Sequence, residues 1–321
     1  MTSSSTPAPS PSSAPAVTPP ATVAFLGLGV MGGPMAAHLA CAGFEVRAFN
    51  RTGSRGDAWL QALRETHPQV RAELCTLPAE AAQGADAVLL CVGADADVLS
   101  VLEGSEGALA TLASGALVID HTTASPTLAR QLAERCESRG VGFLDAPVSG
   151  GQAGAEQGAL TIMVGGAKNS FVRAQSVLDC YGKRVRHLGP AGSGQLAKIV
   201  NQVCIAGLLQ GLAEGIHFAE QAGLDVDAVI EVISAGAAQS WQLDNRARTM
   251  TRREFDFGFA VDWMRKDLGL ALAEADHLGA RLPVAALVQQ FYGDVQAEGG
   301  GRWDTSSLIQ RFSRGTKSRL A

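Results

Sequence analysis

The sequence predicts an α/β fold: a doubly wound parallel sheet followed by an all-helical C-terminal domain. Three observations support this. Short apolar runs alternate with segments of helical length up to about residue 188, and the runs are almost continuously apolar, as in strands covered on both faces. After Gly189, apolar residues recur at helical spacing with few interruptions. The 321 residues should therefore form two domains.

The expected strands are short runs rich in β-branched and apolar residues. They are VAFLGLG (23–29), EVRAFN (45–50), DAVLLCV (86–92), ALVID (116–120), GVGFLDAPV (140–148), ALTIMVGG (159–166) and RVRHLG (184–189). The helical patterns of the second domain cover 194–222, 225–238, 263–278, 282–298 and 304–314. Asp225 and Asp304 suit the starts of two of these helices, and Gly223 and Gly279 suit the ends of two.

The ends of the chain differ from its middle in composition. Residues 1–20 contain Ser, Thr, Pro and Ala without a charged side chain, which predicts a disordered leader. This stretch lacks the basic start and apolar run of a secretory signal. We expect an α/β domain over 21–188 and a helical domain for substrate binding and oligomerisation over 189–321.

Composition argues against several classes of function. The net charge is −5 and the Lys and Arg residues are scattered, so we expect no nucleic-acid partner. No apolar run approaches the roughly 20 residues of a membrane helix, so we expect no membrane partner. The six cysteines are widely spaced, without a CxxC pair or a His cluster. We interpret them as reduced core residues of a cytoplasmic protein, with no metal site.

A glycine-rich turn joins the first expected strand to the first helix. Gly27 permits a tight turn, Gly29 lets the backbone approach a pyrophosphate, and Gly32 allows close packing of the helix on the strand. The start of the helix then stabilises the anion. With a strand before it and a second strand after the helix, this G-x-G-x-x-G pattern predicts a dinucleotide-binding domain of the Rossmann type. The expected cofactor contacts include the whole turn, namely Gly27, Leu28, Gly29, Val30, Met31 and Gly32.

The end of the second strand bears on the choice of cofactor. NAD-selective sites place an Asp or Glu there, whereas this chain has Asn50, Arg51 and Thr52. Arg51 can stack on the adenine and pair with a 2′-phosphate. NADP is therefore favoured, with NAD still possible and a solvated loop arginine as the alternative interpretation.

Four stretches together resemble the β-hydroxyacid dehydrogenase family, which includes 3-hydroxyisobutyrate dehydrogenases, tartronate semialdehyde reductases and glyoxylate/succinic semialdehyde reductases. The resemblance runs from about residue 22 to 314. It implies a Rossmann domain joined by a long helix to a helical domain, with the active site between them. It also implies a homo-dimer or homo-tetramer. The stretches are FLGLGVMGGPMAAHL from Phe25, DAPVSGG from Asp145, GPAGSGQLAKIVNQ from Gly189 and RKDLGLAL from Arg265.

The resemblance assigns the substrate site. It makes Lys198 the general acid/base, and it gives Ser149, Gly150 and Gly151 the substrate carboxylate, helped by Asn201. Small side chains and exposed N–H groups after a strand suit a carboxylate. Asn201 and Gln202 follow Lys198 at i+3 and i+4, so the three should share a helix face, and we expect both to bind the substrate. Many family members have a second asparagine where this chain has Gln202, and tartronate semialdehyde reductases share the Asn-Gln version.

The resemblance also extends the cofactor site. Thr122 and Thr123 match a Ser/Thr pair near the nicotinamide ribose, and Lys266 matches a lysine that approaches the cofactor from the helical domain. A local ion pair between Lys266 and Asp267 is the alternative. Val92, at the end of its strand, is expected beside the cofactor. Trp241 either lines the substrate pocket or packs in the core.

These observations predict hydride transfer between NADP(H) and a short 3-hydroxy acid or its semialdehyde. Imine reduction is an alternative, because imine reductases share the glycine turn and the Asn-Arg-Thr string, but they generally lack the lysine and the Ser-Gly-Gly motif. A non-catalytic NADP-binding interaction module is the other alternative. No motif identifies the hydroxy acid, since pocket shape discriminates among such small substrates.

Overall fold

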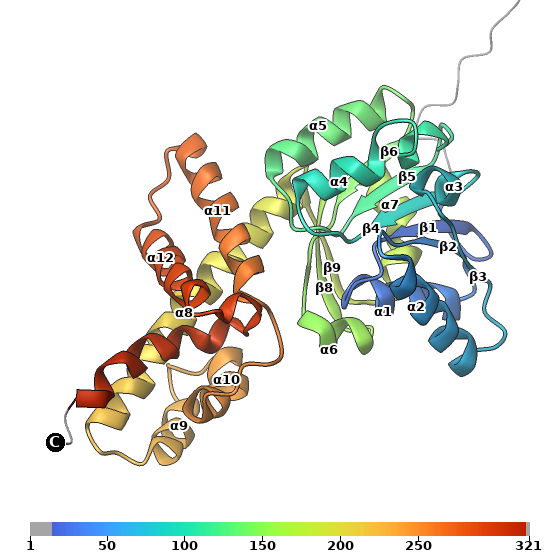
Figure 1. Cartoon of the computed structure of the whole chain (residues 1–321). Coiled ribbons are helices and arrows are strands. Elements are labelled where there is room, and N and C mark those ends of the chain that lie inside the picture. Colours follow the sequence, from blue (N-terminus) through green and yellow to red (C-terminus); the bar gives the residue numbers. More distant parts are fainter. Residues whose placement is uncertain (1–14, 319–321) are drawn as a thin grey trace, which may run out of the picture. The chain divides into compact units, whose positions relative to one another are not determined.

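The computed structural model describes residues 15–318 and divides the chain into two compact units, Met1–Lys198 and Ile199–Ala321 (Figure 1). The first is built on a sheet and the second is helical, which confirms the predicted fold class. The division falls within a long helix, α8 (Ser193–Gln221), rather than at the predicted boundary near residue 188.

In the described residues, the first unit contains one mostly parallel sheet with the order β3-β2-β1-β4-β5-β6-β8-β7, and β9 pairs with β8. Strands β1, β2, β3, β4, β5 and β6 are parallel, as the near-continuous apolar runs predict. The bounds are β1 Thr22–Leu26, β2 Glu45–Phe49, β3 Ala72–Leu74, β4 Ala87–Leu90, β5 Leu117–Asp120, β6 Gly142–Asp145, β7 Val148–Ser149, β8 Leu160–Gly166 and β9 Gly182–Gly189.

The far edge of the sheet departs from the parallel prediction. β8 runs antiparallel to both β6 and β7, while β9 is parallel to β8. The expected strand over 140–148 is two strands, because β6 ends at Asp145 and the chain turns before β7. Composition alone does not reveal strand direction, and the three-residue β3 is too short to give a periodic signal.

Helices cover both faces of this sheet. Side chains alternate along β4: Leu89 packs with residues of α1 and α7 on one face, whereas Val88 and Leu90 pack with residues of α3, α4 and α5 on the other. Both cores consist of aliphatic and aromatic residues that are almost fully buried. The helices are α1 Gly32–Cys41, α2 Gly53–Thr66, α3 Pro78–Ala82, α4 Asp95–Leu102, η2 Ala108–Ala110, α5 Pro126–Glu137, α6 Gly151–Glu156 and α7 Lys168–Leu178.

The second unit packs its helices around the buried Tyr292 and neighbouring aliphatic side chains. Asp225 caps α9 and Gly279 ends α11 in a left-handed conformation, as predicted. The expected helix at 304–314 is a 3₁₀ helix, and α10 was not predicted. The bounds are α9 Val226–Ser234, α10 Trp241–Arg252, α11 Val261–Leu278, α12 Pro283–Ala297, η3 Gly300–Arg302 and η4 Thr305–Ser318.

Helix α8 corrects the expectation that no segment resembles a membrane span. Among the described residues it is the one helix long and apolar enough to cross a membrane, judged by length and composition. Only 33% of its most apolar window is buried. Isolated Gly and Gln residues break its apolar runs in the sequence, although its average hydropathy stays high. Core helices of soluble proteins pass the same test.

The last residues of the predicted leader are ordered against the α/β unit. Val17 is buried in the core beside α7, its N–H donates to the carbonyl of Arg173, and its own carbonyl accepts from Ser176. The Arg173 guanidinium also donates to the carbonyl of Pro15. The prediction of a disordered leader is therefore wrong for residues 15–20, because the Val17 side chain is buried in the core of the α/β unit. Residues 1–14 lie outside the described part of the chain.

We expect Val17→Ala to lower the free energy of unfolding by about 1–2 kcal/mol, since two buried methyl groups are lost. Val172→Ala is a matched control because Val172 is 58% exposed on the adjoining helix. The control should change stability by less than about 0.5 kcal/mol. Urea denaturation measures both, and equal effects of the two substitutions would contradict the docking of Val17.

Candidate active site

The glycine turn lies where β1 leads into α1, and two of its glycines cannot carry a side chain. Gly27 has φ +100°, and a Cβ there would lie 2.5 Å from the carbonyl oxygen of Cys91. A Cβ on Gly32 would lie 2.0 Å from the carbonyl oxygen of Gly27. Around Gly29 the space is open within 4 Å. The turn thus has the tight bend, close helix packing and open backbone that a pyrophosphate needs.

The start of α1 is available to an anion. Its N-cap residue, Met31, makes no side-chain capping bond, and the first turn carries no acidic residue. Val30 beside it is 66% exposed. Unsatisfied N–H groups and the helix dipole favour a phosphate at such an end. These residues therefore fit a nicotinamide dinucleotide, with the diphosphate at Gly29 and the N-terminus of α1.

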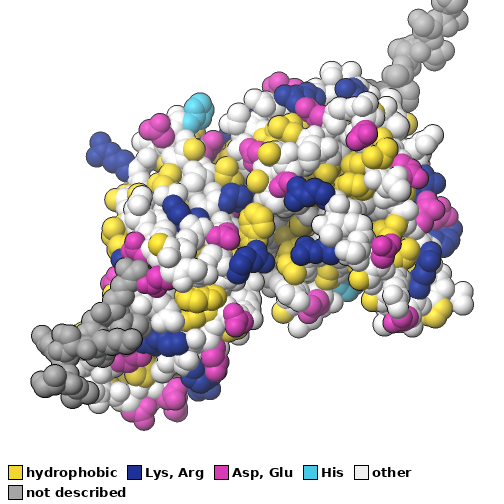
Figure 2. Space-filling view, viewed as in Figure 1, with side chains coloured by type: hydrophobic (Ala, Val, Ile, Leu, Met, Phe, Trp, Pro, Cys, Tyr) yellow, Lys and Arg dark blue, Asp and Glu magenta, His cyan; other side chains and the backbone are white. Residues whose placement is uncertain are grey.

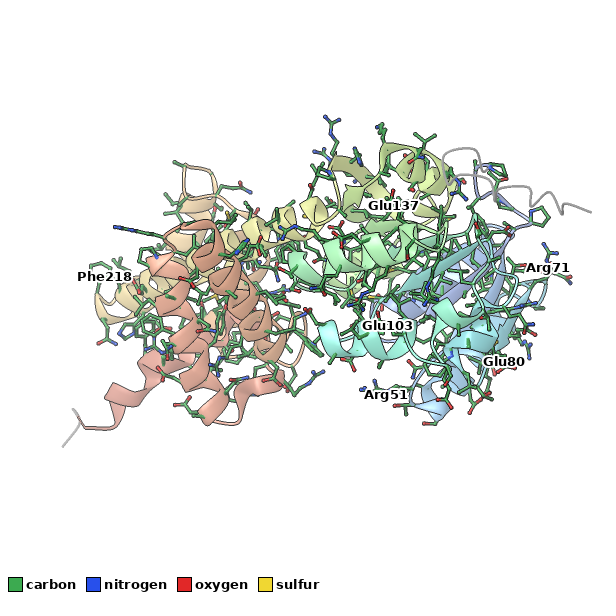
Figure 3. All side chains as sticks on the ribbon, turned by 90° about the horizontal axis from the view of Figure 1, so that it is seen from above. Arg51, Arg71, Glu80, Glu103, Glu137 and Phe218 are labelled. Atoms are coloured by element: carbon green, nitrogen blue, oxygen red, sulfur yellow. The ribbon has the colours of Figure 1, made fainter. Side chains whose placement is uncertain are left out.

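Hydrogen bonds of the Asn50 side chain hold the short loop after β2. The Asn50 side chain accepts from the N–H of Leu28 at 2.9 Å and donates to the carbonyl of Thr52 at 2.8 Å, so it braces the glycine turn. The Arg51 side chain, labelled in Figure 3, is 85% exposed. It pairs with Asp97 of α4 at 2.7 Å. The guanidinium is at the surface, where a 2′-phosphate could compete with the carboxylate of Asp97.

Of the two threonines after β5, the first is structural. Thr122 is buried, and its hydroxyl accepts from the N–H of Val92 at 3.1 Å, which ties the end of β4 to the loop after β5. Thr123 is half-buried. Thr123 is the more exposed member of the pair, and its contact with a cofactor stays a prediction.

The Ser149–Gly151 segment leaves the sheet as a turn that leads into α6. Ser149 pairs with Thr161 on β8, and Gly150 and Gly151 are exposed with φ values of +136° and +62°. These backbone conformations favour glycine. The segment presents a hydroxyl and uncrowded backbone amides, the chemistry expected for a carboxylate.

Two buried carboxyl groups lie side by side at the ends of β5 and β6. Asp120 and Asp145 are paired in register, and both are almost fully buried. Burial raises the pKa of Asp120 to about 7, opposed by hydrogen bonds from Thr122. Burial also raises the pKa of Asp145 to about 6, although backbone amides of the α8 start counter it. Each carboxyl therefore depends on its hydrogen-bond donors to stay ionised.

Between them along the chain, His121 forms a buried pair with Tyr181. Burial lowers the pKa of His121 to about 4, so the ring is neutral at pH 7. Its Nδ1 lies 2.7 Å from the carbonyl of Ala146 and must carry the proton, because a carbonyl only accepts. Nε2, at 2.9 Å, then accepts from the Tyr181 hydroxyl. This pair holds the backbone between Asp145 and Ser149.

Lys198 lies one turn into α8 and is buried, with 8% of its surface exposed. The first turn of the helix is tied to the ends of the strands. Asp145 accepts from the N–H groups of Gly192 and Gln195, and the Gln195 side chain donates to the carbonyl of Thr122. The predicted acid/base is therefore placed beside the carboxyl ends of the parallel strands, where ligands of such sheets bind.

In the helical unit, the polar residues predicted from the same motifs form one chain of contacts. Asn201 donates to the Gln202 carbonyl oxygen at 2.8 Å, and the Gln202 amide donates to Asp267 at 2.5 Å. Lys266 pairs with Asp267 at 3.2 Å. Gln202 is buried, and its amide both accepts from Asn201 and donates to Asp267. Its contact with the substrate stays a prediction.

Trp241 is not a core residue. It begins α10 and is 57% exposed, with the Arg246 guanidinium 4.8 Å from the ring centre. This geometry fits a cation–π contact. Of the two interpretations, core packing is excluded, and a place at a substrate pocket stays a prediction.

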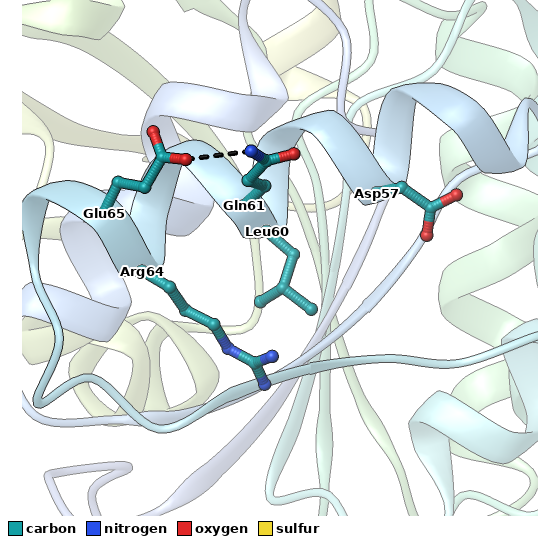
Figure 4. Close-up of a pocket in the computed structure, with 5 residues that line it drawn as sticks. All are labelled: Asp57, Leu60, Gln61, Arg64 and Glu65. Carbon is teal, nitrogen blue, oxygen red and sulfur yellow. Dashed lines mark hydrogen bonds between the residues drawn. The ribbon is translucent and has the colours of Figure 1, made fainter.

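Other surface features do not compete with this site. The hollow in Figure 4 is lined by Asp57, Leu60, Gln61, Arg64 and Glu65 of α2 alone and contains no predicted site residue. On the face shown in Figure 2, basic and acidic side chains are intermixed. Within residues 15–318, no group of three His, Cys, Asp or Glu side chains could hold a metal. None of the six cysteines forms a disulfide, although Cys41 and Cys204 are exposed rather than in the core.

Comparisons with known proteins agree with this geometry. Residues 22–189 match the family model described as the NAD binding domain of 6-phosphogluconate dehydrogenase. Residues 192–312 match the model described as the NAD-binding domain of NADP-dependent 3-hydroxyisobutyrate dehydrogenase. The chain belongs to the 3-hydroxyisobutyrate dehydrogenase family. It is an oxidoreductase of the NAD(P)-dependent β-hydroxyacid dehydrogenases.

Relatives within this family align over nearly the whole chain. An oxidoreductase of Shewanella frigidimarina is 54% identical over 92% of this chain and 99% of its own. The 3-hydroxyisobutyrate dehydrogenase of Pseudomonas aeruginosa is 36% identical over 91% and 98%. The Mycobacterium tuberculosis 3-hydroxyisobutyrate dehydrogenase, solved with L-serine, has a TM-score of 0.82 and 32% identity over 91% and 98%.

Motif reasoning missed the residues that connect the family motifs. Asp145 begins the DAPVSGG stretch and Gln195 lies in GPAGSGQLAKIVNQ, but neither stretch indicates what these side chains contact, and no motif contains His121. A charged residue ending an apolar strand was the available signal for Asp145 and Asp120. Their partners are distant in sequence, so only the fold identifies them.

We expect the two glycines of the turn to respond differently to alanine. Gly32→Ala places a methyl group against the backbone of Gly27 and should lower both stability and cofactor affinity. Gly29→Ala has open space, so stability should change by less than about 1 kcal/mol. Affinity should still fall, because the methyl group intrudes on the diphosphate. Thermal unfolding and NADPH fluorescence titration measure the two effects, and full affinity in Gly29→Ala would refute this placement.

Proposed function

We propose that this chain catalyses reversible hydride transfer between NADP(H) and a short 3-hydroxy acid or its semialdehyde, of the 3-hydroxyisobutyrate or tartronate/succinic semialdehyde type. The supporting observation is the position of Lys198, buried one turn into a helix whose start is tied to the ends of β5 and β6. The related dehydrogenase solved with L-serine supports a small hydroxy acid as the substrate class.

Lys198 is proposed as the general acid/base. When bound, the nicotinamide supplies or accepts the hydride. In the reductive direction the Lys198 ammonium would give its proton to the carbonyl oxygen as the carbonyl carbon gains the hydride, which forms the alcohol. In the oxidative direction the neutral amine would take the hydroxyl proton. Such proton transfer typically contributes about 10²–10⁴-fold to the rate.

Ser149, Gly150 and Gly151 are proposed to hold the substrate carboxylate. Exposed backbone amides and a hydroxyl at this turn offer donors without bulk. Asn201, which follows Lys198 by one turn of α8, is the proposed additional donor, and its amide is oriented by Gln202. Lys266 is proposed to contact the cofactor, and its ion pair with Asp267 would preset its position.

NADP is the proposed cofactor because of Arg51. The loop after β2 carries no carboxylate at the position that would accept from a ribose hydroxyl, and Arg51 stands exposed at its surface. Its partner Asp97 contributes little in water, since exposed ion pairs are worth only about 0–1 kcal/mol. A 2′-phosphate, with more charge, would replace Asp97 as the partner of Arg51.

A homo-oligomer is proposed as the working form. Helix α8 leaves apolar side chains exposed, with Val200 at 63%, Leu208 at 38% and Phe218, labelled in Figure 3, at 71%. A second copy of the chain would cover such surface. The cytoplasm is the proposed compartment, since none of the six cysteines forms a disulfide.

We expect NADPH-dependent turnover in a spectrophotometric screen of 3-hydroxyisobutyrate, glycerate, 4-hydroxybutyrate, serine and their aldehydes with both cofactors. Lys198→Ala should lower kcat by about 10²–10⁴-fold with NADPH affinity retained. Lys183→Ala is the matched control, because Lys183 is exposed on β9. Normal turnover by Lys198→Ala would contradict the acid/base role of Lys198. No rate with any substrate would instead favour a non-catalytic module.

The cofactor assignment has its own test. Arg51→Ala should weaken NADPH binding roughly tenfold more than NADH binding, because only NADPH has the 2′-phosphate that makes the charge-assisted contact. Arg64→Ala, an exposed arginine on the same helix-loop region, is the control. Fluorescence titration with both nucleotides measures the ratio. Tighter binding of NADH than NADPH by the wild-type protein would overturn the preference.

A further inference from the structure

Asp145 connects β6 to α8 through both of its carboxylate oxygens. Oδ1 accepts from the N–H of Gly192 at 2.8 Å, and Oδ2 accepts from the N–H of Gln195 at 2.9 Å. The side chain is fully buried. N–H groups at the start of a helix have no partner within that helix, so a carboxylate there acts as a remote cap. The start of α8 is therefore held at the end of β6 by hydrogen bonds to one charged group.

Gln195 adds a second attachment from the same turn. Its side chain donates to the carbonyl of Thr122 at 2.7 Å and accepts from the N–H of Ala124 at 3.1 Å. Gln195 is also completely buried. The first turn of α8 is thus hydrogen-bonded both to the loop after β5 and to the end of β6. Lys198 follows Gln195 by three residues, which is about 4.5 Å along a helix.

Two glycines make this close approach possible. A Cβ on Gly194 would lie 2.4 Å from the carbonyl oxygen of Met163 and 2.6 Å from that of Asp145. A Cβ on Gly165, on β8, would lie 2.5 Å from the Asp145 carboxylate. The first turn of α8 therefore touches the backbone of two strands, and any displacement of it would carry Lys198 along.

We propose that Asp145 is a positioning residue for Lys198, because its carboxylate fixes the start of α8 against the strand ends from which the lysine acts. This inference rests on the proposed function. Asp145 touches neither substrate nor cofactor in this account. It sets where the lysine amine stands relative to the reacting carbonyl, and misplacement by about 1 Å can reduce a rate on the order of 10²-fold.

Asp145→Asn is the sharpest substitution because it keeps the size of the side chain. Its carbonyl oxygen can accept from one amide, but its NH₂ group then faces the other N–H, donor against donor. The start of α8 would lose one attachment and shift. Gly194→Ala is a second variant that displaces the same turn, because its Cβ would press on the carbonyl oxygens of Met163 and Asp145 and lie 2.9 Å from Oδ2 of Asp145, while the carboxylate itself is kept. Gly211→Ala, farther along α8 with open space around it, is the matched control.

The kinetic test compares kcat, the KM for the hydroxy acid and NADPH affinity in the full-length protein. Asp145→Asn and Gly194→Ala should lower kcat on the order of 10²-fold, with KM and NADPH affinity changed by no more than about threefold. Gly211→Ala should match wild type. In a Lys198→Ala background, Asp145→Asn should cause no further loss of kcat, since it acts through the lysine. Retained kcat in Asp145→Asn, or an equal further loss in that background, would overturn the proposal.

Amide hydrogen exchange separates this proposal from the proposed function. Asp145→Asn should speed exchange in a peptide covering residues 190–200 by about tenfold or more, with residues 206–221 unchanged. If the wild-type protein turns over no hydroxy acid, the proposed function fails while exchange still tests the attachment. Unchanged exchange at 190–200 would show that Asp145 does not hold the helix start, which would overturn the inference even in an active enzyme.

Discussion

The hydrogen bonds between the buried Asp145 carboxylate, at the end of β6, and the start of α8 are the interaction on which the position of Lys198 depends. Asp145 is desolvated, which raises its pKa to about 6, and it is stabilised by amides at the start of α8. Removing a charge from water is costly unless donors replace the water. The helix supplies these donors and gains a cap in return. The end of the sheet and the origin of the long helix therefore stabilise each other.

The predicted site residues lie at the same edge of the sheet because the central strands are parallel. The carboxyl ends of β1, β4, β5 and β6 lie together, so the glycine turn, the Thr122 loop and the Ser149–Gly151 turn come from one side. Hydrogen bonds connect these loops: Val92 to Thr122, Gln195 to Thr122, and His121 to Ala146, the last two fully buried. The ends of β4 and β5, the loop after β6 and the start of α8, which carries Lys198, are thereby held by one network.

The sequence predicted the elements whose signals are local. The glycine turn, the apolar strands, the Asp225 cap and the Gly279 stop all depend on neighbouring residues. It did not predict the antiparallel direction of β8, the polar helix α10 or the docking of Val17, which depend on distant partners. Asp145 illustrates the limit, since the amides it binds are 47 and 50 residues away. A sequence motif can include such a residue, but it does not predict which distant groups that residue contacts.

The central claim is that Lys198, carried by the anchored start of α8, moves the proton during hydride transfer. Chemical rescue of Lys198→Ala by small primary amines tests it most directly. The account predicts that added amine restores part of the NADPH-dependent rate in proportion to its concentration, because the amine takes the place of the missing side chain. A folded, NADPH-binding Lys198→Ala protein that either works at the wild-type rate or gains nothing from any amine would contradict the account.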